Sequence, residues 1–191
     1  MWQWLIPSEG GYMNYPFYAA QDADTALNSM AFRNPEAEFL NRSCISCCSM
    51  LVERMLGLSF PPELCANFAV RSGVGSDPFQ FSLLAGAIAG RFSLQLRYSN
   101  DPEQAIRMIA DGAKSIVQYE YRQKSIQNGF VMVDSLKDKE ITVLNPSYQK
   151  GKGLPRERKR MISLHDDYLL MPLEIFHEFY GENARFYLYS L

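Results

Sequence analysis

Three cysteines stand close together in this 191-residue chain, at Cys44, Cys47 and Cys48. A cysteine at the start of a helix lies at the positive end of the helix dipole, which favours the thiolate and makes Cys44 a candidate nucleophile. Acyl transfer by a thiolate also needs an imidazole, which lowers the thiol pKa, protonates the leaving amine and contributes about 10²–10⁴ in rate. The residues therefore indicate a thiol enzyme only if a histidine reaches Cys44.

The chain has two histidines, His165 and His177. His177 stands inside a predicted helix, where we expect a surface or structural role. His165 lies near a predicted strand and reaches Cys44 only if the final sheet departs from the usual topology. A second interpretation of the cysteines stays open, in which they are small apolar side chains that fill a tight contact between a helix and a sheet.

Other chemistry is less well supported by the spacing of the residues. Cys44 and Cys47 have the spacing of a redox pair, but thioredoxin-like motifs need a βαβ context that this segment lacks. Cys65 and a histidine do not complete a zinc site, because a second close pair of ligands is missing. We therefore predict no metal site and no cofactor.

Composition indicates one domain with a sizeable core. The chain is 47% hydrophobic and carries a net charge of −2, so a polyanionic partner is not expected. The basic stretch Lys150–Arg160 is the one hint of nucleic acid, and such a run is more often a solvated loop. No apolar run is long enough for a membrane span, and the first residues do not resemble a signal peptide. The four cysteines show no disulfide pattern, which indicates a cytoplasmic protein.

The pattern of apolar residues predicts an irregular arm over residues 1–42, a helical part over 43–90 and a mainly antiparallel sheet over 91–191, within one domain of the α+β class. The expected helices are Ser43–Leu56, which ends at Gly57, Pro61 to about Arg71, one that follows Pro78, one capped by Asn100 or Asp101, and Leu173–Tyr180. The expected strands are Phe92–Tyr98, Ser115–Tyr121, Phe130–Asp134, Glu140–Leu144, Tyr168–Met171 and Ala184–Ser190.

This order of elements resembles the papain-like cysteine peptidases, in the branch that processes bacteriocin leaders at a double glycine. Six short patterns carry the resemblance, from the opening strand to the closing helix. They are residues 14–22, Ser43 to Gly57, Asp111 to Gln118, Gly129 to Val133, Val143 to Pro146 and Pro172 to Gly181. The resemblance implies a papain-like fold with N-terminal helices packed on an antiparallel sheet.

The same resemblance implies roles for individual residues. Cys44 matches the nucleophile, Asn145 the residue that orients the histidine and Gln21 the oxyanion glutamine, offset by one position. The family's histidine position is occupied by Gly129, which Asn128 precedes. The nucleophile is therefore present and the base is absent.

We accordingly expect a bacterial protein without peptidase activity. It binds a peptide or protein partner in the former substrate cleft, near Gln21, Cys44, Asn128, Gly129 and Asn145. The alternative is an active thiol hydrolase or acyltransferase in which His165, or a polar group such as Asn128, replaces the base. A third class, a purely structural interaction subunit, would leave the cleft closed.

Overall fold

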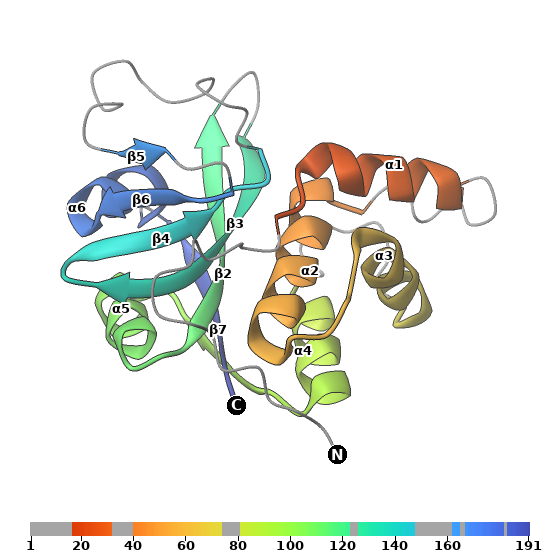
Figure 1. The fold of residues 1–191 in the computed structure, drawn as a ribbon, viewed down its shortest axis with the longest axis horizontal. Helices are drawn as coiled ribbons and strands as arrows, with labels where there is room; N and C mark the ends of the chain where they lie inside the picture. The colour runs from red at the N-terminus through yellow and green to blue at the C-terminus, as the bar shows by residue number, and fades with distance from the viewer. Residues whose placement is uncertain are drawn as a thin grey trace, which may run out of the picture.

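The computed structural model describes residues 17–31, 40–73, 81–122, 126–147, 162–164, 167–181 and 183–191. A single twisted sheet divides the molecule (Figure 1). Helices α1 to α4 lie on one side of the sheet, and α5 and α6 lie on the other. The α+β class predicted from the sequence is confirmed.

The helices follow the predicted order, with one addition in the arm. Their bounds are α1 Ala20–Ala31, α2 Arg42–Leu56, α3 Pro62–Arg71, α4 Phe81–Phe92, α5 Pro102–Ala110 and α6 Leu173–Phe176, which continues as the π-helical turn η4, His177–Gly181. Helix α2 is the central one, and all its residues from 44 to 52 are buried. Asn41 caps its start with a side chain that accepts from the Cys44 N–H, and Gly57 ends it in the left-handed region at φ 64°.

Two predicted elements are wrong, and the strand expected over Phe130–Asp134 is longer than predicted, at Ile126–Lys137. The first is the irregular arm with its opening strand, because residues 17–19 form no strand and α1 begins at Ala20, whereas residues 14–16 lie outside the described part. Asp22 accepts a hydrogen bond from the Ala19 N–H and so starts a helix, whose buried Ala23, Ala26 and Leu27 repeat at helical spacing. The second is the strand expected from Phe92, which instead ends α4.

The sheet is antiparallel throughout, with its strands in the order β1-β7-β2-β3-β4-β6-β5. The strand bounds are β1 Gln95–Ser99, β2 Lys114–Arg122, β3 Ile126–Lys137, β4 Glu140–Leu144, β5 Ser163–Leu164, β6 Leu169–Pro172 and β7 Arg185–Ser190. Strands β3 and β4 form the predicted hairpin around Asp138 and Lys139, which adopt φ 51° and 67°. The two-residue strand β5 was not predicted.

Each face of the sheet has its own hydrophobic core. In β3, Phe130 and Met132 belong to the core beneath α1 to α4, whereas Val131 and Val133 belong to the core beneath α5 and α6. This is the alternation expected of a strand, in which successive side chains point to opposite faces. We call these the α2 face and the α5 face.

Candidate functional site

Three chain segments meet at the start of α2, and this junction positions Cys44. The Ala20 N–H donates to the Pro146 carbonyl at 2.9 Å, which joins the start of α1 to the end of β4. The Ser46 hydroxyl donates to the Ala19 carbonyl at 3.1 Å, which joins α2 to the same point of the chain. Segments 126 residues apart in sequence, at Ala20 and Pro146, therefore meet at one point, as a thiol-enzyme site would require.

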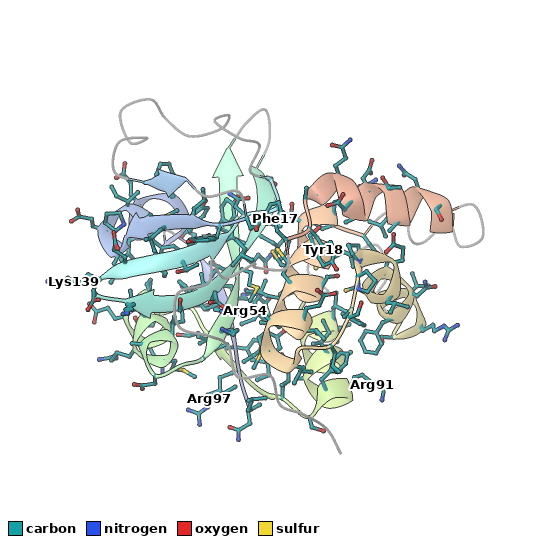
Figure 2. The ribbon with its side chains drawn as sticks, viewed as in Figure 1. Phe17, Tyr18, Arg54, Arg91, Arg97 and Lys139 are labelled. Atoms are coloured by element: carbon teal, nitrogen blue, oxygen red, sulfur yellow. The ribbon has the colours of Figure 1, made fainter. Side chains whose placement is uncertain are left out.

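Exposed and half-buried polar side chains form the rim of this junction. The Ser43 and Ser147 hydroxyl oxygens lie 3.2 Å apart and connect the first turn of α2 to the residues after β4. Gln21 lies on the first turn of α1, where its side chain is exposed and its carbonyl accepts from the Thr25 hydroxyl. Phe17 precedes this turn and packs against the core of the α2 face, close to α2 (Figure 2).

The Cys44 side chain points into the protein, not toward the rim. Only 6% of the residue is exposed, and Cys47, Cys48 and Cys65 are fully buried around it. The pKa of the Cys48 thiol is influenced by both Cys44 and Cys65, so the thiols of α2 and α3 lie next to one another. The cluster joins α2 to α3, in agreement with the interpretation of these cysteines as packing residues.

Burial opposes the thiolate that a nucleophile would need. It raises the pKa of the Cys44 thiol, and the hydrogen bond from Cys48 offsets this only in part. The pKa values of Cys47, Cys48 and Cys65 are raised still further, again chiefly by burial. Desolvation therefore acts against the activation of Cys44 that the helix dipole was expected to provide.

The position that matches the family's histidine is covered by a tyrosine ring. Gly129 in β3 pairs directly with Tyr119 in β2. A Cβ atom added to Gly129 would lie 2.4 Å from Cζ of Tyr119, closer than real side chains approach. A histidine at position 129 would therefore require the Tyr119 ring to move away.

Asn145, which matches the orienting residue, is bound to a second tyrosine. Its amide Nδ2 donates to the Tyr180 hydroxyl at 3.0 Å, and its Oδ1 accepts from the Ser147 N–H at 2.9 Å. The Tyr180 ring meets the Tyr119 ring edge to face, with centroids 4.9 Å apart. Burial raises the pKa of Tyr180 to about 12, so this hydroxyl is neutral at ordinary pH. We call Tyr119 and Tyr180 the tyrosine pair.

The strand alternation places the tyrosine pair and Cys44 on opposite sides of the sheet. Phe130 belongs to the α2 face, so the neighbouring Gly129 faces the α5 side, where the Tyr119 ring packs. Tyr180 also belongs to the core of the α5 face, whereas Cys44 belongs to that of the α2 face. The structure thus brings Gly129 and Asn145 together through the tyrosine pair, and it does not bring them to the Cys44 sulfur.

The remaining predicted site residues are placed as follows. Asn128 is described by its backbone, which pairs with Glu120 in the β2–β3 ladder. His165 lies outside the described residues. His177 is half-buried in η4, with its ring 6.0 Å from that of Phe176, and no described imidazole interacts with the Cys44 thiol.

A buried carboxylate that the sequence analysis missed lies at the opposite end of α2. The side chain of Asp134 is only 2% exposed, and it accepts hydrogen bonds from Arg54 Nε at 2.8 Å and from the Lys114 ammonium. Burial alone would raise the pKa of Asp134, but the hydrogen bonds from Arg54 and Lys114 hold it below its usual value. The available signal was an aspartate that ends an apolar strand, beside a lysine at the start of another.

No family model matches this chain, and no curated protein matches it. The part of the chain that the structure describes contains no helix long and apolar enough to cross a membrane. The same residues contain no group of three or more histidine, cysteine or acidic side chains that could hold a metal ion.

Proposed function

We propose that this protein has the scaffold of a papain-like peptidase without its thiol chemistry, and that it binds a peptide or protein partner at the former substrate cleft. The observation that carries the proposal is the tyrosine pair. The Tyr119 ring covers the strand position of the missing histidine. The Tyr180 hydroxyl accepts a hydrogen bond from the Asn145 amide, which in the family would orient the imidazole. The buried and hydrogen-bonded thiol of Cys44 supports the same conclusion.

The binding surface that we propose is the rim of the junction between α1, α2 and the end of β4. Gln21 and Ser147 are exposed there, and Ser43 and Asn145 are partly exposed. These side chains and the first turns of two helices offer hydrogen-bond partners to the backbone of an extended peptide. The resemblance favours a bacterial secretion, toxin or peptide-maturation system, and the free, buried thiols are compatible with a cytoplasmic location.

Thiol labelling tests the loss of chemistry. Native protein is treated with iodoacetamide near pH 7, and each cysteine is followed by mass spectrometry, with urea-unfolded protein as the fast control. We expect all four thiols to react slowly, because each must first be exposed by an opening of the structure. Rapid labelling of Cys44 alone, slowed in His165→Ala, would support the thiol enzyme instead.

Binding is tested with a fluorescein-labelled synthetic peptide that ends in two glycines, the leader type implied by the resemblance. Ser147→Tyr places a bulky ring on the rim, and Lys137→Tyr places the same ring on an exposed residue near the distant β3–β4 turn. We expect the first variant to weaken binding at least tenfold and the second to leave it unchanged. Equal binding by both variants would contradict the proposed location.

A further inference from the structure

A hollow lies where the start of α4 meets the end of β1 and the start of β7, on the α2 face of the sheet. Its volume is about 480 Å³, within the range of small-molecule sites in proteins. The described residues that line it are Ser82 and Leu83 of α4, Tyr98, Ser99 and Asn100 at the end of β1, and Arg185 and Tyr187 of β7. The hollow therefore combines two aromatic rings and an aliphatic side chain with neutral polar groups and one cation.

The aromatic wall of the hollow is held in place by its neighbours. The Tyr98 and Tyr187 rings meet edge to face with centroids 5.3 Å apart, and the Tyr187 ring meets the Phe81 ring at 4.5 Å. The Tyr98 hydroxyl donates to the Ser82 carbonyl at 3.4 Å, which joins β1 to α4. Tyr98 and Leu83 are nevertheless 53% and 57% exposed, so both offer apolar surface to a ligand. A wall that is already ordered can accept a flat ring without rearrangement.

Arg185 supplies the charge of the hollow. A hydrogen bond from Arg185 acts to lower the pKa of Tyr187 against the stronger effect of burial. The Tyr187 hydroxyl in turn donates to Gln118 Oε1 at 3.1 Å. These two hydrogen bonds hold the guanidinium beside the tyrosine wall. Because a guanidinium has several N–H donors, others remain for a ligand.

No carboxylate of a described residue forms an ion pair with Arg185. Glu120, two residues beyond Gln118 on β2, forms none with it, and none of the described residues that line the hollow is acidic. The described lining therefore carries a single positive charge, which complements a monoanion. A guanidinium matches a carboxylate in shape as well as charge, because two of its N–H groups can donate to the two oxygens in parallel.

From this arrangement we propose that the hollow binds a small aromatic carboxylate. The ring of the ligand lies against Tyr98 and Leu83, and its carboxylate accepts hydrogen bonds from Arg185. The apolar contact supplies affinity, and the guanidinium selects the anion over a neutral compound of the same shape. This site is separate from the rim at the junction of α1, α2 and β4 and does not depend on the function proposed there.

The probe is cinnamate, and neutral cinnamamide is a control of nearly the same shape. Each compound is titrated into the isotopically labelled protein and followed through the backbone amide signals by NMR. We expect cinnamate to bind at least about fivefold more tightly than cinnamamide. Both should shift the amide signals of Leu83, Tyr98 and Asn100. This comparison requires no change to the protein, so it does not depend on whether a variant folds.

Two variants separate the contribution of the charge from that of the ring. Arg185→Gln should reduce the affinity for cinnamate to that for cinnamamide. Arg91→Gln, which makes the same change at an exposed position near the end of α4 (Figure 2), should leave the affinity unchanged within about twofold. Tyr98→Ala should weaken the binding of both compounds and preserve the preference for cinnamate.

Equal affinity for cinnamate and cinnamamide, shifted signals confined to other parts of the protein, or unchanged binding in Arg185→Gln would overturn the proposal. Ser147→Tyr should leave the binding of cinnamate intact, so failure at the rim and failure at this hollow give different results.

Discussion

Gly129→Ala is the most direct test of how the tyrosine pair covers the position of the missing histidine. A methyl group at this position would lie 2.4, 2.6 and 2.8 Å from Cζ, the hydroxyl oxygen and Cε1 of Tyr119. The ring must therefore rotate, although its partner Tyr180 holds it in an edge-to-face contact at 4.9 Å.

The magnitude follows from three opposing terms. Overpacking of this kind costs about 1–3 kcal/mol, and loss of the aromatic contact costs about 0.5–1.5 kcal/mol. Replacing a glycine restricts the unfolded chain and returns about 0.4–1 kcal/mol. Together these terms predict that Gly129→Ala lowers the free energy of unfolding by about 0.5–4 kcal/mol, with a central value of about 2 kcal/mol.

A double-mutant cycle measured by urea unfolding provides the assay. For a urea dependence of about 2 kcal/mol per M, the expected loss moves the midpoint of urea unfolding by about 0.3–2 M, and the central value moves it by about 1 M. Tyr119→Ala removes the ring, so Gly129→Ala should cost little in that background, and the coupling between the two changes should exceed about 1 kcal/mol. Equal costs of Gly129→Ala in the two backgrounds would refute the reasoning, because the ring would then not occupy the position.

Three further predictions concern stability. Asp134→Asn should lower the free energy of unfolding by about 2–4 kcal/mol near pH 7, because Arg54 and Lys114 lose a buried partner. The folded-state pKa of Asp134 is depressed, so its contribution is present above the unfolded value and is lost as the pH falls through the folded value. Urea unfolding from pH 7 to 3 should therefore show that the difference in free energy of unfolding between wild type and Asp134→Asn shrinks below about pH 4. A difference that stays constant over this range would contradict the ion pair. Burial raises the pKa of Tyr180 from 10.0 to about 12 in the folded protein. Its contribution to the free energy of unfolding is therefore present below pH 10.0 and is lost as the pH rises toward 12. Between these pH values, Tyr180→Phe should lose less stability than wild type. Asn41→Ala removes the side chain that caps α2 and should cost about 1 kcal/mol in urea unfolding, whereas Asn41→Ser should restore most of it.

The sequence determined the elements whose signals are local. The helix that carries Cys44 was predicted to within one residue, because its apolar stripe and Gly57 mark it in the chain itself. Strand β4 was predicted with its observed bounds, and the charged turn before it was recognised as a hairpin. The start of α1 was missed because Asp22, the first-turn residue that accepts from the Ala19 N–H, follows turn formers and aromatics that predicted an irregular arm.

Only the tertiary structure decided what the candidate site can do. The stretch from Phe130 to Val133 is apolar at every position, because the strand is buried on both faces, so its sequence does not reveal which face each residue takes. That choice places Gly129 on the side away from Cys44. The contacts of Tyr119 with Gly129 and of Tyr180 with Asn145 join residues from separate elements and leave no periodic pattern in the sequence. The residue types near Cys44 were readable from the chain, but burial and strand orientation, which decide reactivity, depend on contacts between distant residues.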